Sequence, residues 1–171
     1  MTLYLISGVL AVFVVINMLL TFALVGRIRL IQETVAAGGA PRDPDLLAPG
    51  ESIQPFEAIT RTGDRLTEAN LAVGATLIGF FTPNCKPCEE SRSQLLGSPP
   101  RLPLIAFVES TGDDDDAAAI AASLSAIARV AYTLDNDSVR RAFRPTSYPT
   151  FVRVENGAVA ASGHKLREVL G

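Results

Sequence analysis

The sequence has few side chains that could hold a metal ion. Its 171 residues include two cysteines, Cys85 and Cys88, and one histidine, His164. A structural zinc site needs about four such ligands, so we expect no metal site. The four aspartates that begin at Asp113 lack the spaced ligands and the terminal glutamate of a calcium loop. We interpret them as the acidic first turn of a helix, where negative charge suits the helix dipole.

Strong net charge and internal repeats are also missing. The formal net charge is −3 at pH 7, which gives no sign of a nucleic-acid-binding surface, and we expect no nucleic acid partner. No repeated segment is evident. Residues 49–171 are about 120 residues, an ordinary length for one domain with a single hydrophobic core.

Charge is absent from the first 26 residues. The run 3–25 is long enough as a helix to cross the about 30 Å hydrocarbon core of a bilayer. Residues 1–26 are therefore predicted to be a single transmembrane helix. A cleaved signal peptide is the alternative, but residues 1–26 lack the basic start and the small-x-small cleavage site before Arg27 that a signal peptide would have. Residues 27–48 are predicted to be a juxtamembrane segment and a Pro/Gly-rich linker.

The two cysteines form a Cys-Lys-Pro-Cys run at the start of a predicted helix. Thiol exchange needs a thiolate, a second thiol within reach and a site that stabilises the negative sulfur. Asn84 is a favoured N-cap residue, which would place Cys85 at the first helical position and lower the pKa of its thiol. Cys88 lies one turn further on. Lys86 adds positive charge, and Pro87 is tolerated in the first turn.

Two other interpretations of this pair remain. A structural disulfide is disfavoured because closing so short a loop removes little entropy from the unfolded chain. The second is a degenerate pair without catalytic function. Spacing and context together favour redox chemistry.

The hydrophobic pattern predicts an alternating α/β domain. Helical crossovers between strands imply a mostly parallel sheet with a terminal antiparallel hairpin. The Asn-Gly pair at 156–157 favours a tight turn in that hairpin. We expect strands at 53–60, 65–68, 75–81, 102–108, 129–133, 151–154 and 158–161, and helices at 85–96, 113–128 and 137–143, followed by a short closing helix.

Two separated motifs resemble a known superfamily. The run FFTPNCKPC, followed downstream by Ser147-Tyr148-Pro149-Thr150 and the strand FVRV, is similar to the thioredoxin superfamily. The upstream run PGESIQPFEAITRTGDRLTEANLAVGATLIGFF resembles its TlpA-like/redoxin (AhpC/TSA) branch. The overall plan also resembles the thioredoxin-like accessory proteins of methylamine utilisation. The resemblance covers about residues 49–164. It implies a thioredoxin-like three-layer fold with an inserted strand–helix unit, and a cis proline facing the cysteines.

This resemblance implies a membrane-anchored thiol–disulfide oxidoreductase that needs no cofactor. Cys85 would attack a client disulfide as a thiolate, or would itself be attacked when it is part of a disulfide. Cys88 would resolve the mixed disulfide. Tyr148 and Pro149 would hold the partner chain. The expected partners are a disulfide-containing client protein, a membrane or soluble thiol electron donor, and the lipid bilayer through residues 3–25. The family analogy favours reduction of the client over its oxidation.

The sequence departs from the family pattern near the cysteines. The buried acid that many thioredoxins carry six positions before the first cysteine is Gly79 here. The glutamate and proline that often follow the second cysteine are Ser91 and Ser93, and Asn84 replaces an aromatic residue. These departures leave the redox potential and the proton route open. For His164, which is distant in sequence from both motifs, we expect a surface or loop position.

Two alternative functions and one conflict accompany this interpretation. A peroxidase of AhpC/TSA type would carry Pro-x-x-x-Thr-x-x-Cys; Thr82 and Cys85 fit this pattern, but Ile78 occupies the proline position. A non-catalytic client-binding or assembly module is the second. Arg27 and Arg29 after the apolar run favour a cytoplasmic domain by the positive-inside rule, whereas the resemblance favours the extracytoplasmic side. We expect the domain to lie on the extracytoplasmic side.

Overall fold

The structure is a computed structural model that describes residue 18 and residues 46–110, 115–134 and 137–170. The chain divides into two units, Met1–Arg42 and Asp43–Gly171, and the fold below is that of the second. The predicted transmembrane helix lies, apart from residue 18, outside the described residues, as does nearly all of the linker. Within the described part of the chain, no helix has the length and apolar character needed to cross a membrane.

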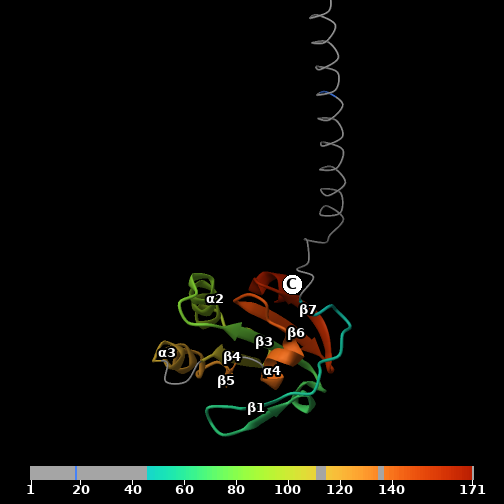
Figure 1. Cartoon of the computed structure of the whole chain (residues 1–171), viewed down its shortest axis with the longest axis horizontal. Coiled ribbons are helices and arrows are strands. Elements are labelled where there is room, and N and C mark those ends of the chain that lie inside the picture. Colours follow the sequence, from blue (N-terminus) through green and yellow to red (C-terminus); the bar gives the residue numbers. More distant parts are fainter. Residues whose placement is uncertain (1–17, 19–45, 111–114, 135–136, 171) are drawn as a thin grey trace, which may run out of the picture. The chain divides into compact units, whose positions relative to one another are not determined.

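A five-stranded mixed sheet forms the centre of the second unit, in the order β5-β4-β3-β6-β7 (Figure 1). The strands β3, β4 and β5 run parallel to one another, because helices connect them. The strand β6 runs antiparallel to β3 and forms a hairpin with β7. The strands are β3 (Ala75–Phe81), β4 (Leu104–Glu109), β5 (Arg129–Thr133), β6 (Thr150–Glu155) and β7 (Ala158–Gly163).

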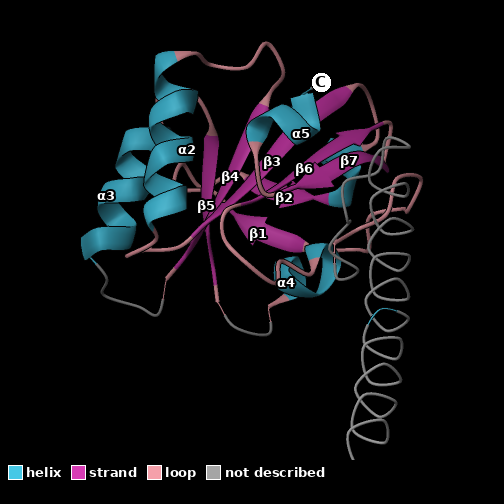
Figure 2. Cartoon of the chain, turned by 90° about the horizontal axis from the view of Figure 1, so that it is seen from above, coloured by secondary structure: helices cyan, strands magenta, loops and turns pink. Residues whose placement is uncertain are grey.

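Helices cover both faces of this sheet (Figure 2). One face carries α2 (Lys86–Gly97), α3 (Asp115–Leu124) and α5 (Leu166–Leu170). The other carries α4 (Ser138–Phe143) and a two-stranded antiparallel hairpin of β1 (Glu57–Ile59) and β2 (Arg65–Thr67), which continues into the short 3-10 helix η1 (Glu68–Leu71). The unit is therefore a three-layer α/β fold, as predicted.

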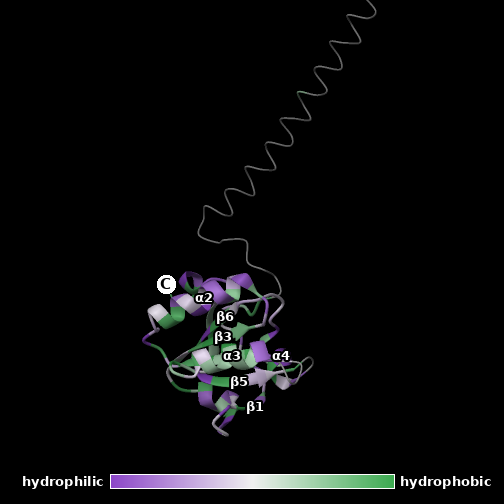
Figure 3. Ribbon diagram, turned by 90° about the vertical axis from the view of Figure 1, so that its left-hand side faces the viewer, coloured by the Kyte–Doolittle hydropathy of each residue, from purple (hydrophilic) through white to green (hydrophobic). Residues whose placement is uncertain are grey.

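Alternate side chains of β3 divide the core into two clusters. Leu77 and Phe81 pack under α2, α3 and α5, whereas Ile78 and Phe80 pack under α4 and the hairpin. All four are at most 1 % exposed. In Figure 3 the regions labelled β3 and β5 are largely green, whereas α2 is largely purple. The strand β3, buried on both faces, ends at Phe81, a short turn before α2 begins at Lys86, and this places the cysteines at the rim of the sheet.

The segment 50–61 contacts both edge strands of the sheet. The backbone N–H of Gly50 donates to the carbonyl of Val159 in β7, at 2.8 Å. Further along, the N–H of Arg61 donates to the carbonyl of Val130 in β5, also at 2.8 Å. The same stretch of chain is thus hydrogen-bonded to the first and the last strand of the sheet.

Most predicted elements are confirmed, with corrections at their ends. The strands at 75–81 and 129–133 have the predicted bounds, and the Asn-Gly turn is present, with φ of 50° at Asn156 and 83° at Gly157. The helix predicted at 113–128 ends at Leu124. The unit β5–α4 supplies the second strand–helix pair expected between the cysteines and Pro149.

Candidate active site

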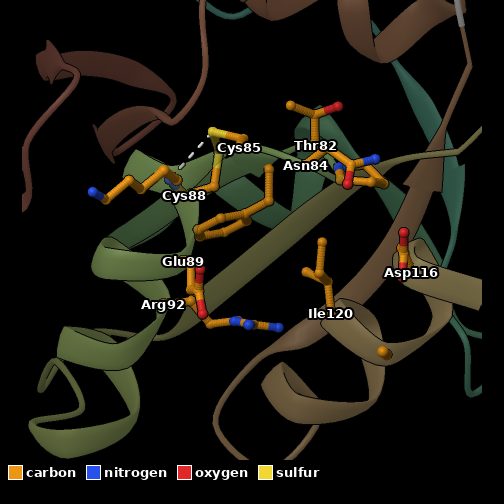
Figure 4. Close-up of a pocket in the computed structure, with 12 residues that line it drawn as sticks. Thr82, Asn84, Cys85, Cys88, Glu89, Arg92, Asp116 and Ile120 are labelled. Atoms are coloured by element: carbon orange, nitrogen blue, oxygen red, sulfur yellow. Dashed lines mark hydrogen bonds between the residues drawn. A yellow bond between two sulfur atoms is a disulfide. The ribbon is translucent and has the colours of Figure 1, made fainter.

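Cys85 and Cys88 lie at the N-terminal end of α2 and form a disulfide. Their Cα atoms are 5.2 Å apart. Cys88 is buried, with 3 % of its surface exposed, whereas Cys85 is half-buried. Figure 4 labels Cys85 and Cys88 among the residues that line a pocket at this end of α2. The difference in burial makes Cys85 the sulfur that an outside reactant meets.

The start of α2 differs from the prediction in one respect. Cys85, not Asn84, is the N-cap residue, and the first helical residue is Lys86. Asn84 has a φ of 57°, the left-handed conformation that asparagine tolerates better than most residues. This turn gives Cys85 an extended backbone, and its Sγ accepts the Cys88 N–H at 3.2 Å, the dashed line in Figure 4. A helix N–H that donates to an N-cap sulfur stabilises the thiolate form of that sulfur.

The other two residues of the motif lie in the first turn of α2. Lys86 and Pro87 are both exposed. Pro87 is the second helical residue, where its missing N–H removes no helical hydrogen bond, so the predicted tolerance of proline is confirmed.

The loop that carries Pro149 lies beside Cys85, although the two are distant in sequence. The Tyr148–Pro149 peptide bond is cis, as the resemblance implied. The carbonyl oxygen of Tyr148 is 3.6 Å from Cys85 Sγ, although the residues are 63 positions apart. Tyr148 itself packs against both core clusters. The two motifs predicted to act together are therefore adjacent in space.

Arg140 holds the Tyr148 side chain and is itself paired with Glu109, and sequence reasoning missed both charged residues. Arg140 of α4 donates from Nη1 to the Tyr148 hydroxyl at 2.8 Å, and its guanidinium carbon is 6.0 Å from the ring centroid. The same Nη1 lies 2.5 Å from Glu109 Oε1, at the end of β4. Arg140 and Glu109 are 24 % and 23 % exposed. Nothing in the sequence marks them, because three separate elements bring these side chains together.

His164 also contacts the Pro149 loop. It lies between β7 and α5, so the predicted loop position is confirmed, but it is half-buried and its Nδ1 is 2.9 Å from the Pro149 carbonyl oxygen. Its distance in sequence from both motifs concealed this contact. The antiparallel pairing of β6 with β7 is the signal that could have revealed it.

Gly79 lies where the resemblance would place a buried acid. A Cβ atom at this position would be 2.9 Å from Phe81 Cε2 and 3.2 Å from Phe151 Cε1. Both rings are fully buried and pack edge to face. The aromatic rings therefore occupy the space that a carboxyl group would need.

A pocket of about 540 Å³ adjoins the disulfide between α2 and α3 (Figure 4). Its wall includes Cys88 and the apolar side chains of Phe81 and Ile120. Glu89, Arg92 and Asp116 add charges of both signs. In the part of the chain that the structure describes, no three His, Cys, Asp or Glu side chains gather so as to hold a metal ion.

Solved structures with a similar fold carry names from disulfide chemistry. The thioredoxin domain of a thiol-disulfide oxidoreductase from Bacteroides vulgatus is 16% identical, with a TM-score of 0.57 over 72% of this chain and 94% of that one. A thio-disulfide isomerase from Thermus thermophilus is 19% identical, with a TM-score of 0.53 over 70% of this chain and 87% of that one. A thiol:disulfide interchange protein from Bacteroides sp. is 18% identical, with a TM-score of 0.55 over 68% and 81%.

These likenesses establish the fold. No protein-family model and no curated protein matches the sequence. The second unit of the chain has the mixed α/β fold of the thioredoxin-like proteins, and it carries a Cys-x-x-Cys disulfide at the start of a helix.

Proposed function

We propose that the protein is a thiol–disulfide oxidoreductase that exchanges disulfides with a partner protein through Cys85 and Cys88. One observation carries the proposal: the disulfide at the start of α2 lies beside the cis-proline loop, with Cys85 Sγ 3.6 Å from the Tyr148 carbonyl oxygen. Similarly folded proteins named for thiol–disulfide exchange support it. The half-exposed Cys85 is the attacking residue, and the buried Cys88 is the resolving one.

In the reducing direction the reaction proceeds in two exchanges. The Cys85 thiolate attacks one sulfur of a client disulfide; a Cys85–client bond forms, and the other client sulfur leaves as a thiolate and takes up a proton. Cys88 then loses its proton and attacks Cys85 Sγ, which releases the second client sulfur. The client gains two electrons and two protons, and Cys85 and Cys88 are left oxidised. A thiol donor, soluble or in the membrane, returns the pair to its reduced form by the same exchange.

The client chain is held at the Tyr148–Pro149 loop. Proline places no N–H against the thiolate, so Pro149 keeps this side of the sulfur free of a competing donor. The backbone of Tyr148, next to Cys85, is placed to pair with an extended client segment. Lys86 and Pro87 tune the pair, Lys86 by its positive charge and Pro87 by stiffening the first turn. Asn84 contributes through the left-handed turn that makes Cys85 the N-cap.

We further propose that the TlpA-like domain, residues 49–171, is anchored in the cell membrane by the helix 1–26 and tethered by the linker 27–48. The uncharged run 3–25 supports the anchor. An extracytoplasmic domain suits a reductase of disulfides, which persist outside the cytoplasm. A membrane-impermeant maleimide applied to intact cells after reduction tests this. Labelling of the two cysteines before lysis supports the proposal, and labelling only after lysis contradicts it.

The exchange itself is tested with two serine variants. With reduced protein and insulin as the disulfide substrate, Cys88→Ser is expected to accumulate a mixed disulfide through Cys85, because the resolving thiol is absent. Cys85→Ser is expected to form none and to reduce no insulin. If the wild type reduces insulin no faster than the rate without protein, the proposal is wrong, and the non-catalytic binding module is favoured instead. Consumption of a hydroperoxide by the wild type but not by Cys85→Ser would favour the peroxidase.

A further inference from the structure

The pairing of β6 with β7 stops one residue short of the cis-proline loop. The last paired residues are Phe151 of β6 and Gly163 of β7. His164 follows β7 directly, and its side chain reaches the Pro149 carbonyl oxygen at 2.9 Å from Nδ1. The His164 side chain thus connects the two chain segments just beyond the last backbone pair.

The hydrogen bonds around His164 determine its tautomer. A carbonyl oxygen can only accept, so Nδ1 must carry the hydrogen that Pro149 receives. In the neutral ring Nε2 is then an acceptor, and Ser147 Oγ, 3.2 Å away, can donate to it. Thr150 Oγ1 donates in turn to the Ser147 carbonyl oxygen at 2.5 Å. Residues on both sides of Tyr148 are therefore linked to one imidazole ring or to each other.

His164 is itself held in place by α5. Glu168 Oε2 accepts the backbone N–H of His164 and that of Lys165, each at 3.1 Å. Glu168 reaches these groups because residue 163 is glycine: a Cβ atom there would lie 2.6 Å from Glu168 Oε2. Val169, the next residue of α5, is 1 % exposed in the core. The imidazole is thus supported by a fixed segment of backbone.

We propose that His164 is a positioning residue for client binding. By holding the Pro149 carbonyl, it keeps the backbone of Tyr148 in place beside Cys85 before a client arrives, so that binding does not have to order the loop. The inference rests on the proposed function, because it needs a client that pairs with Tyr148. It does not involve His164 in proton transfer or in the chemistry of either sulfur.

The test compares a protein substrate with a small one. Insulin presents its disulfides on a chain that needs the loop, whereas the small disulfide DTNB reacts without one. His164→Leu removes the donor and should slow insulin reduction about threefold to tenfold, the range expected for one hydrogen bond, while DTNB reduction changes less than about twofold. His164→Asn keeps a donor where Nδ1 stands and should retain the insulin rate within about twofold.

Two further variants complete the test. His164→Gln moves the donor toward the Nε2 position and should lose insulin reduction as His164→Leu does; it serves in place of the leucine variant if that one does not fold. Lys165→Ala is the matched control, since the side chain of this exposed neighbour has no part in the network, and it should react as the wild type does.

Three results would overturn the inference. One is that the wild type reduces insulin and that His164→Leu and His164→Gln reduce it at the same rate. Another is an equal loss on insulin and DTNB, which would mean that the histidine affects the disulfide itself. The third is an asparagine variant as slow as the leucine variant. A wild type that reduces neither substrate would instead overturn the proposed function, and this inference with it.

Discussion

Replacing Gly79 with alanine would place a methyl group where two aromatic rings already lie. The added Cβ would be 2.9 Å from Phe81 Cε2 and 3.2 Å from Phe151 Cε1. These rings are fully buried, with centroids 5.9 Å apart in an edge-to-face arrangement. Neither contact is with the far end of a flexible side chain, so the packing of β3 against β6 has to give way.

Two opposing effects set the size of the change. Overpacking a well-packed core costs about 1–3 kcal/mol. Replacing glycine restricts the unfolded chain and returns about 0.4–1 kcal/mol. We therefore expect Gly79→Ala to lower the free energy of unfolding by roughly 0.5–2 kcal/mol. At roughly 4 °C per kcal/mol for a domain of this size, the melting temperature should fall by about 2–8 °C.

Urea unfolding of the purified protein, followed by circular dichroism, measures this change. The midpoint should fall with the slope unchanged. Gly97→Ala is the matched control: an added Cβ there meets nothing within 4 Å, and alanine is the better residue in a helix, so its midpoint should stay or rise. Gly79→Asp, which restores the acid of the family pattern, should lower the midpoint more than alanine does, because its carboxyl would be buried among apolar rings.

The reasoning would be refuted if Gly79→Ala were as stable as the wild type or more stable. That result would mean that the rings of Phe81 and Phe151 yield at little cost, and that a side chain at position 79 is compatible with this core. An aspartate variant more stable than the alanine variant would refute the second expectation separately.

Three further predictions concern α4 and the redox pair. Asp137→Ala should lower the free energy of unfolding, measured in urea, by about 0.5–2 kcal/mol, because Asp137 caps α4 by accepting the Arg140 N–H at 2.7 Å. Asp137→Asn keeps the acceptor and should retain most of the stability. Equal losses in the two variants would contradict this prediction. Arg140→Leu should slow insulin reduction about threefold to tenfold, because the hydrogen bond to the Tyr148 hydroxyl is lost together with the Glu109 ion pair. DTNB reduction should stay unchanged, because the hydrogen bond and the ion pair do not involve the disulfide; equal effects on both substrates would contradict it. In the reduced protein, iodoacetamide should alkylate Cys85 roughly tenfold faster than Cys88 by peptide mass spectrometry, because Cys85 is more exposed and caps the helix; similar rates would contradict this.

Local sequence was sufficient for elements with unambiguous ends. The strand 75–81 is a near-continuous apolar run between Gly74 and Pro83, and both of its predicted ends are correct. The turn at 156–157 follows from the preference of asparagine and glycine for positive φ. The start of α2 was not decidable in this way, because asparagine is favoured both as an N-cap and in the left-handed conformation. At position 84 the chain uses the second property.

The candidate site was predictable only where a motif marked it. Cys85, Cys88 and Pro149 stand in recognisable runs, and the structure brings them together. Arg140 has no such mark, since its role depends on how α4 packs beside the end of β4 and the Tyr148 loop, and the pattern of single residues along the chain does not contain that arrangement. His164 stands in no motif either, and only the predicted pairing of β6 with β7 could have placed it near Pro149.

The segment 50–61 also affects the tendency of the protein to self-associate. An edge strand presents unpaired backbone groups to which another chain can add, and this is a common route to aggregation. Here Gly50 occupies a carbonyl of β7 and Arg61 one of β5, so a single stretch of chain shields both rims at these positions. A fragment that began after residue 61 would expose both rims at once, and we expect it to self-associate more than the intact domain does. The same shielding supports the proposed pairing of a client chain at the Tyr148 loop, because these backbone groups of the two rims are already hydrogen-bonded.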